Sequence, residues 1–151
     1  MVGIQPFGSI SFGSKNVQDP EMLVAGIGSS IPFGNISYAL YSEMHWLDYN
    51  VAKRGTLSLL REYGLFAGFS AGASFTVADY LSIRNPDQFF LAIAADTGNR
   101  YVPHLFSDWE TLLANKAAAP TYINDIEALA RPWSAMLRPE GFEMLDPVKN
   151  A

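Results

Sequence analysis

The stretch GLFAGFSAGA, residues 64–73, sets the architecture expected of this chain. Its apolar part, 65–69, has the length of a strand, and small residues then lead directly into a helical pattern that continues to about Arg84. A strand that passes into a helix through small residues presents backbone groups and a hydroxyl at the carboxyl edge of a parallel sheet, where open α/β folds bind ligands. The stretch is therefore also the first candidate for a functional site.

Two strands and a helix are expected before it. Residues 1–6 form a short apolar run that ends at a proline, and residues 44–47 form a second one. Asp48 has the chemistry of a helix N-cap, and the helix that it opens is expected to end at Gly64. Its buried face is predicted to carry Ala52, Thr56, Leu59, Leu60 and Tyr63.

One more strand is expected after it. Asn85-Pro86-Asp87 interrupts the second helix, and the uncharged run 89–95 predicts a strand covered on both faces. The order strand, helix, strand, helix, strand is typical of a mostly parallel sheet with crossover helices. We therefore expect an α/β fold.

The rest of the chain has weaker patterns. Residues 7–35 are rich in Gly, Ser, Pro and Asn, which predicts a long irregular segment. Helical patterns follow at 109–117 and 123–131, and a tail punctuated by prolines begins at Pro132. The two helices must pack against something, for which a partner subunit or a further part of the protein is a candidate. Trp46 and Trp109 are expected in the core or in an interface.

Composition excludes several classes of function. The net charge is -5, the pI is near 4.8, and no cluster of Lys and Arg is present, so a nucleic-acid partner is not expected. No apolar run is long enough to span a bilayer. The chain has no cysteine, and His45 and His104 stand alone without further ligands at metal spacing, so no metal site is predicted. The cytoplasm is the expected location.

The same stretch matches the motif of a serine hydrolase. Residues 68–72 have the pattern G-x-S-x-G, and Asp96 and His104 follow in the chain order of a catalytic triad. However, only two strands are expected before Ser70, and Asp96 and His104 are close together in sequence. A hydrolase is kept as an alternative.

Four blocks resemble the C-terminal half of the type II, tryptophan-synthase-β-like family of pyridoxal-phosphate enzymes, which includes cysteine synthase and cystathionine β-synthase. The resemblance covers about residues 1–106, and residues 107–151 are interpreted as a helical C-terminal extension. It implies a partial three-layer sheet that is incomplete relative to the whole family fold. The blocks are VGIQP at 2–6, AGIGSSIP at 25–32, YGLFAGFSAGA at 63–73 and DTGNRY at 96–101.

The resemblance implies pyridoxal phosphate as cofactor. The serine that matches Ser70 hydrogen-bonds the pyridine nitrogen in this family, and Asp96, Thr97 and Gly98 would lie near the ring. The block with Gly26, Ile27 and Gly28 would border the substrate, because glycines let the backbone approach closely. Each residue also has a structural interpretation: Ser70 and Asp96 as helix N-caps, and Gly26 and Gly28 as turn glycines.

The family's Schiff-base lysine has no match here. The chain has Lys15, Lys53, Lys116 and Lys149, and none stands in a matching context. The family's phosphate-binding loop and substrate loop are also unmatched, so no catalytic residue is assigned and little activity is expected of the chain alone.

The leading hypothesis is thus a C-terminal fragment or subunit of a β-replacement or β-elimination enzyme that acts on an amino acid. The complementary N-terminal half or a partner chain would supply the lysine, in a homo- or hetero-oligomer. A non-catalytic binding or scaffold subunit is the second hypothesis.

Overall fold

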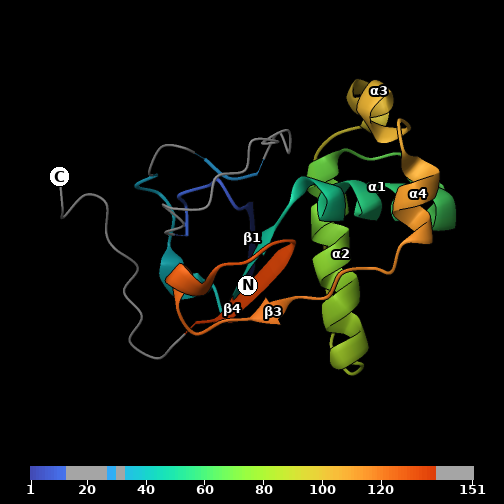
Figure 1. Ribbon diagram of the computed structural model, residues 1–151. Coiled ribbons are helices and arrows are strands. Elements are labelled where there is room, and N and C mark those ends of the chain that lie inside the picture. Colours follow the sequence, from blue (N-terminus) through green and yellow to red (C-terminus); the bar gives the residue numbers. More distant parts are fainter. Residues whose placement is uncertain (13–26, 30–32, 139–151) are drawn as a thin grey trace. The chain divides into compact units, whose positions relative to one another are not determined.

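The computed structural model describes residues 1–12, 27–29 and 33–138. It consists of two compact units (Figure 1). The described residues of the first lie within 1–48 and 120–138, and those of the second within 49–119. Each unit is therefore treated by itself.

The first unit is an open sheet with the strand order β1-β2-β4-β3. Its strands are β1 (Val2–Pro6), β2 (Glu43–Leu47), β3 (Thr121–Tyr122) and β4 (Trp133–Leu137). β1 pairs with β2 in parallel, β2 with β4 antiparallel, and β3 with β4 in parallel. Two short 3-10 helices, Tyr38–Leu40 and Ile126–Ala128, belong to the same unit.

The core of this unit forms around the central strand β2. Its residues 44–47 are all buried, and the expected core position of Trp46 is confirmed by an exposed fraction of 0%. The strands expected at 1–6 and 44–47 are likewise confirmed. The core cluster consists of Phe7, Phe12, Met44, Trp46, Ile123 and Met136.

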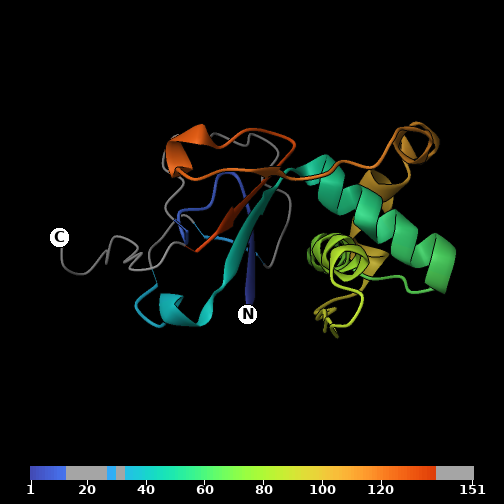
Figure 2. The ribbon, with the colours of Figure 1, turned by 90° about the horizontal axis from the view of Figure 1, so that it is seen from below.

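The second unit is built on two helices, α1 (Tyr49–Tyr63) and α2 (Phe69–Arg84), which cross steeply (Figure 2). Both match the sequence expectation, and Gly64 ends α1 in the left-handed region with φ 68°. A glycine from each helix lies at the crossing. A Cβ on Gly55 would stand 2.1 Å from the carbonyl oxygen of Gly72, so the two backbones touch there. Three short helices complete the unit: 3-10 helix Gly98–Tyr101, α3 (Val102–Leu105) and α4 (Trp109–Ala114).

Most of the predicted buried faces are confirmed. Ala52, Thr56 and Leu59 of α1 are buried, but Tyr63 is 60% exposed, because it lies in the last turn of the helix. Trp109, expected in a core or interface, is 41% exposed in the described unit.

Two expected strands are not formed. Residues 65–69 contain only an isolated bridge between Ala67 and Thr97, and 89–95 form no strand. The predicted burial of 89–95 is also wrong, since Phe89 and Leu91 are 106% and 94% exposed. A strand needs a hydrogen-bonded neighbour, and none of the described residues of this unit supplies one to 89–95.

The predictions for the C-terminal region are also corrected. The helix expected at 109–117 ends at Ala114. The helix expected at 123–131 is only the 3-10 turn Ile126–Ala128, and the predicted tail after Pro132 contains β4. Pairing with β2 makes 133–137 a strand where an irregular tail was expected, and Trp133, Ala135 and Met136 are buried in that sheet.

The α/β class is confirmed, with two of the three strand pairings parallel. Among the described residues, no helix has the length and apolar character needed to cross a membrane. The same residues contain no group of three or more His, Asp or Glu side chains that would hold a metal ion.

Candidate functional site

The N-terminus of α2 and the segment 96–98 are joined by backbone hydrogen bonds. The amide of Gly68 donates to the carbonyl of Asp96 at 3.0 Å, and the amide of Gly98 donates to the carbonyl of Phe66 at 3.0 Å. These two bonds frame the bridge between Ala67 and Thr97. They hold the carboxyl side chain of Asp96 beside the first turn of α2.

The Asp96 carboxylate receives two hydroxyl groups. Ser70 Oγ donates to Oδ1 at 3.5 Å, and the phenol of Tyr101 donates to Oδ2 at 2.9 Å. Ser70 is only 6% exposed, whereas Asp96 is half-buried. The structure thus brings a buried serine, a carboxylate and a tyrosine into one cluster, called here the Asp96 cluster.

The Asp96 carboxylate lies beside the N-terminus of α2. The partial positive charge at the N-terminus of a helix stabilises a nearby anion, and α2 has no acidic residue of its own in its first turn. Burial, followed by the hydrogen bond and the charge of Asp96, raises the pKa of Tyr101 above its ordinary value. Tyr101 therefore remains a hydrogen-bond donor to Asp96 throughout the neutral range. Its ring also packs against Phe69, with the ring centroids 4.6 Å apart.

Two glycines make room for this arrangement. A Cβ on Gly68 would lie 2.0 Å from Oδ1 of Asp96, and a Cβ on Gly98 would lie 2.4 Å from the ring of Phe66. Gly68 is also the N-cap residue of α2, with extended backbone. The expectation that Ser70 caps this helix is therefore wrong, because Ser70 lies one residue inside it. The cap of the following 3-10 helix is Thr97, not Asp96.

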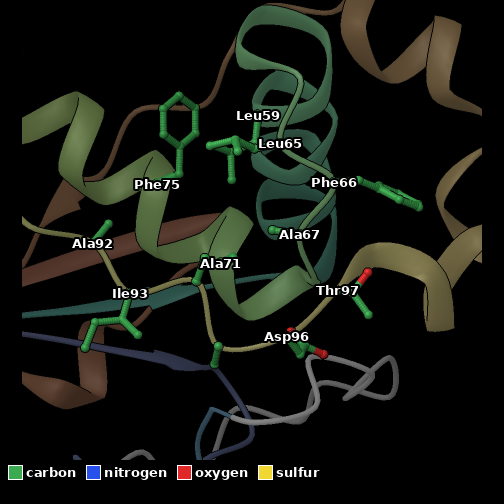
Figure 3. A pocket seen from close by; sticks show the side chains of 12 residues that line it. Leu59, Leu65, Phe66, Ala67, Ala71, Phe75, Ala92, Ile93, Asp96 and Thr97 are labelled. Atoms are coloured by element: carbon green, nitrogen blue, oxygen red, sulfur yellow. The ribbon is translucent and has the colours of Figure 1, made fainter.

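A cavity of about 540 Å³ opens beside the cluster (Figure 3). Asp96 and Thr97 lie at one end of it, and Phe75 and Ala92 lie at the other. The remaining wall is apolar, so the polar groups of the cavity are concentrated at the Asp96 end. It is lined by Leu59, Leu65, Phe66, Ala67, Ala71, Phe75, Ala92, Ile93, Ala94, Ala95, Asp96 and Thr97.

Four of the predicted site residues, Ser70, Asp96, Thr97 and Gly98, lie together in the second unit. Ile27 and Gly28 belong to the first unit, where Gly28 has φ 78° and a Cβ on it would meet Pro6 and Ser9. Gly26 lies outside the described residues.

Sequence reasoning gave no role to Tyr101. Tyr101 stands five residues after Asp96 in the sequence, which does not by itself predict a contact between them. The 3-10 helix Gly98–Tyr101 brings the Tyr101 hydroxyl back to the carboxylate.

The geometry contradicts the hydrolase motif. A nucleophile elbow holds its serine at a strained turn between strand and helix. Here Ser70 is inside a regular helix, and no residue other than glycine has positive φ in the described part of the chain. Ser70 also contacts Asp96 directly, and within the described ranges no hydrogen bond joins the ring of His104 to either of them.

Of the four lysines, Lys53 and Lys116 lie within the described residues. Lys53 is 2% exposed, and its ammonium donates to Ser107 Oγ at 3.2 Å and forms an ion pair with Asp108. This lysine is therefore engaged in holding the N-terminus of α4 against α1. Lys116 is exposed.

Comparison with known proteins finds similarity in solved structures. Neither a model of a known protein family nor a curated protein sequence matches the chain. In fold the chain is similar to O-ureido-L-serine synthase. The solved structure is a lysine-to-alanine mutant of that synthase with O-ureido-L-serine bound; the TM-score is 0.60 and the sequence identity is 24%.

The match covers 76% of this chain and 38% of the synthase chain. The chain therefore spans well under half of the solved protein. At this identity the likeness establishes the fold, which agrees with the α/β class expected from the sequence.

Proposed function

We propose that this chain is the C-terminal part of a pyridoxal-phosphate enzyme of the cysteine-synthase type, which catalyses β-replacement or β-elimination on an amino acid. The observation that carries the proposal is the Asp96 cluster in a fold similar to that of O-ureido-L-serine synthase. The name of that synthase describes the formation of an amino acid with a substituent on its side-chain oxygen, which is the kind of compound that β-replacement forms.

The residues of the cluster fit the pyridine nitrogen of the cofactor. The hydroxyl of Ser70 is buried, and its contact with Asp96 is 3.5 Å, the long limit for a hydrogen bond between hydroxyl and carboxylate. Because this hydrogen bond is long and weak, turning the hydroxyl toward a stronger acceptor would cost little free energy. Pyridoxal phosphate supplies an electron sink for the substrate when it is bound. Ser70 would hold the ring nitrogen with a neutral donor, which keeps that sink weak and favours β-elimination over transamination.

Thr97 and Gly98 would border the ring from the adjacent segment. Gly98 is buried against Phe66, and its lack of a side chain keeps the backbone of 96–98 close to 66–68. Ile27, Gly28 and Gly26 are proposed for the substrate side, on the basis of the glycine-rich block alone. No catalytic residue of the chain is assigned.

Neither the Schiff-base lysine nor a phosphate site is assigned to the described residues. The buried Lys53 is held by Asp108 and Ser107, which opposes its use as a nucleophile. A phosphate group needs several donors, and no basic cluster is present in the sequence. We therefore propose that a complementary N-terminal half or a partner chain supplies a lysine and the phosphate site, in an oligomer located in the cytoplasm. The division into 1–106 and 107–151 belongs to the same proposal.

The test compares the chain alone with a mixture. The second component is a polypeptide that carries the part of O-ureido-L-serine synthase outside the match, with its lysine intact. Both samples receive pyridoxal phosphate and O-acetyl-L-serine, and the visible absorbance and the release of acetate are measured. We expect neither signal from the chain alone and both from the mixture, with loss of acetate release in Ser70→Ala.

The alternatives give different results. A visible band from the chain alone, lost on substitution of one of its lysines, would contradict the missing lysine. Binding of the second component without acetate release favours a scaffold subunit. Labelling of Ser70 by a fluorophosphonate would favour the hydrolase, against the helical position of that serine.

A further inference from the structure

Residues 89–95 form an exposed apolar segment in the second unit. Phe89, Leu91 and Ile93 are 106%, 94% and 74% exposed, and the segment contains no charged residue. Apolar side chains exposed singly are common, but three in a row at alternate positions are not. The segment therefore presents a continuous apolar edge.

Part of the segment lies against α2. Phe89, Phe90 and Ala92 line a cavity of about 490 Å³ with Phe75 and Ala78 of α2. Figure 3 shows Ala92 directed toward Phe75 and Ile93 directed away from it. The segment thus lies along α2, while Leu91 and Ile93 remain largely exposed.

The backbone of the segment has no partner in the part of the chain that the structure describes. No hydrogen bond of an amide or carbonyl of 89–95 is formed there, whereas the next carbonyl, that of Asp96, accepts the amide of Gly68. An uncharged apolar segment with unpaired backbone groups is a template for strand addition.

We propose that residues 89–95 are a docking strand, to which the complementary part of the fold adds a β-strand. This inference rests on the proposed function for the identity of the partner. The occupant is a strand with apolar side chains on the face that meets Leu91 and Ile93. The solved protein of similar fold has more than half of its length outside the match, so a fold of this kind includes further chain that is able to supply the strand.

Docking at this place affects the Asp96 cluster directly. The segment ends at Asp96, so a strand added along 89–95 reaches the edge at which Ser70 and Asp96 lie. Strand ends at such an edge are where open α/β folds bind ligands. The docked strand would therefore bring the partner's residues to the site that this chain leaves incomplete.

The test uses the full chain and, as probe, the polypeptide with the part of O-ureido-L-serine synthase outside the match. Hydrogen exchange of the amides of 89–95 and the Kd of the mixture are measured for wild type, Ile93→Glu and Ile83→Glu. Ile83 is the matched control, because it is also 74% exposed but lies on α2 outside the segment. We expect the amides of 89–95 to be protected from exchange in the mixture. We also expect Ile93→Glu to raise the Kd roughly tenfold or more, because a charge would be buried without a partner.

Several outcomes would overturn the inference. Absence of binding, binding without protection of 89–95, or equal weakening by Ile93→Glu and Ile83→Glu would each contradict a docking strand here. Self-association of the chain through 89–95 would replace the proposed occupant with a second copy. Protection without bound cofactor or acetate release leaves docking established and refutes the proposed function, so the two failures are distinct.

Discussion

The phenol of Tyr101 donates a 2.9 Å hydrogen bond to Oδ2 of Asp96, on the side of the carboxylate opposite to the contact with Ser70. The tyrosine thereby fixes the orientation of the carboxylate, which in turn sets where the serine hydroxyl is held. Ser70 and Asp96 were expected at the site from the sequence. Tyr101, which connects them to the 3-10 helix, was given no role there.

The first prediction concerns Tyr101→Phe. Removing the hydroxyl leaves one oxygen of a half-buried carboxylate without its donor, which lowers the free energy of unfolding by about 1 kcal/mol near neutral pH. Urea unfolding checks this. Since the pKa of folded Tyr101 is raised, its contribution is complete below the unfolded pKa of about 10 and is lost as the pH rises through the folded pKa. The difference between wild type and variant should therefore shrink above pH 10, and a constant difference would contradict the assignment.

The second prediction concerns Gly68→Ala. The added methyl group would stand 2.0 Å from Oδ1 of Asp96, so the carboxylate must move and the contact with Ser70 is broken. We expect a loss of about 1–3 kcal/mol in the free energy of unfolding, as for other overpacked positions. Gly34→Ala is the control, because a Cβ there meets no described atom within 4 Å. Equal stability of the two variants would show that the cluster is not packed as described.

The third prediction concerns the helix crossing, where two effects oppose each other. Gly55→Ala improves the helix propensity of α1 by about 1 kcal/mol. The new methyl group, however, would lie 2.1 Å from the backbone carbonyl of Gly72, which has no side-chain freedom to move away. We expect the clash to win, with a net loss of about 2 kcal/mol measured by thermal or urea unfolding. A stabilised variant would mean that α1 and α2 do not touch at these glycines.

The fourth prediction concerns acid stability. The hydrogen bond from Lys53 lowers the pKa of Asp108, and the charge of the lysine acts in the same direction against the cost of burial. A lowered pKa contributes stability above the unfolded value of about 4, and this contribution is lost as the pH falls through the folded pKa. Asp108→Asn should therefore unfold with a smaller dependence on pH in the acid range than wild type. Glu110→Gln, a change at a neighbouring exposed carboxyl of α4, is the matched control.

Local patterns were sufficient for much of the fold. The helices at 49–63 and 69–84 follow from apolar periodicity and from the stop at Gly64, and the strands at 1–6 and 44–47 follow from short apolar runs. These features depend on residues near one another in the chain, so the sequence alone predicts them. The grouping of Ser70 with Asp96, Thr97 and Gly98 was also expected, as an implication of the family resemblance.

Tertiary structure decided where a strand needs a distant partner. Residues 133–137 become a strand because β2 pairs with them, although they follow a proline and were expected in an irregular tail. Residues 89–95 have a stronger strand pattern, yet they remain unpaired, because no described neighbour in this chain offers its backbone. The sequence by itself determined the helices and the apolar runs, since these depend on local spacing. Only the tertiary structure decided which runs are paired, and that Tyr101 reaches Asp96, since hydrogen bonds between distant segments require both partners to be in place.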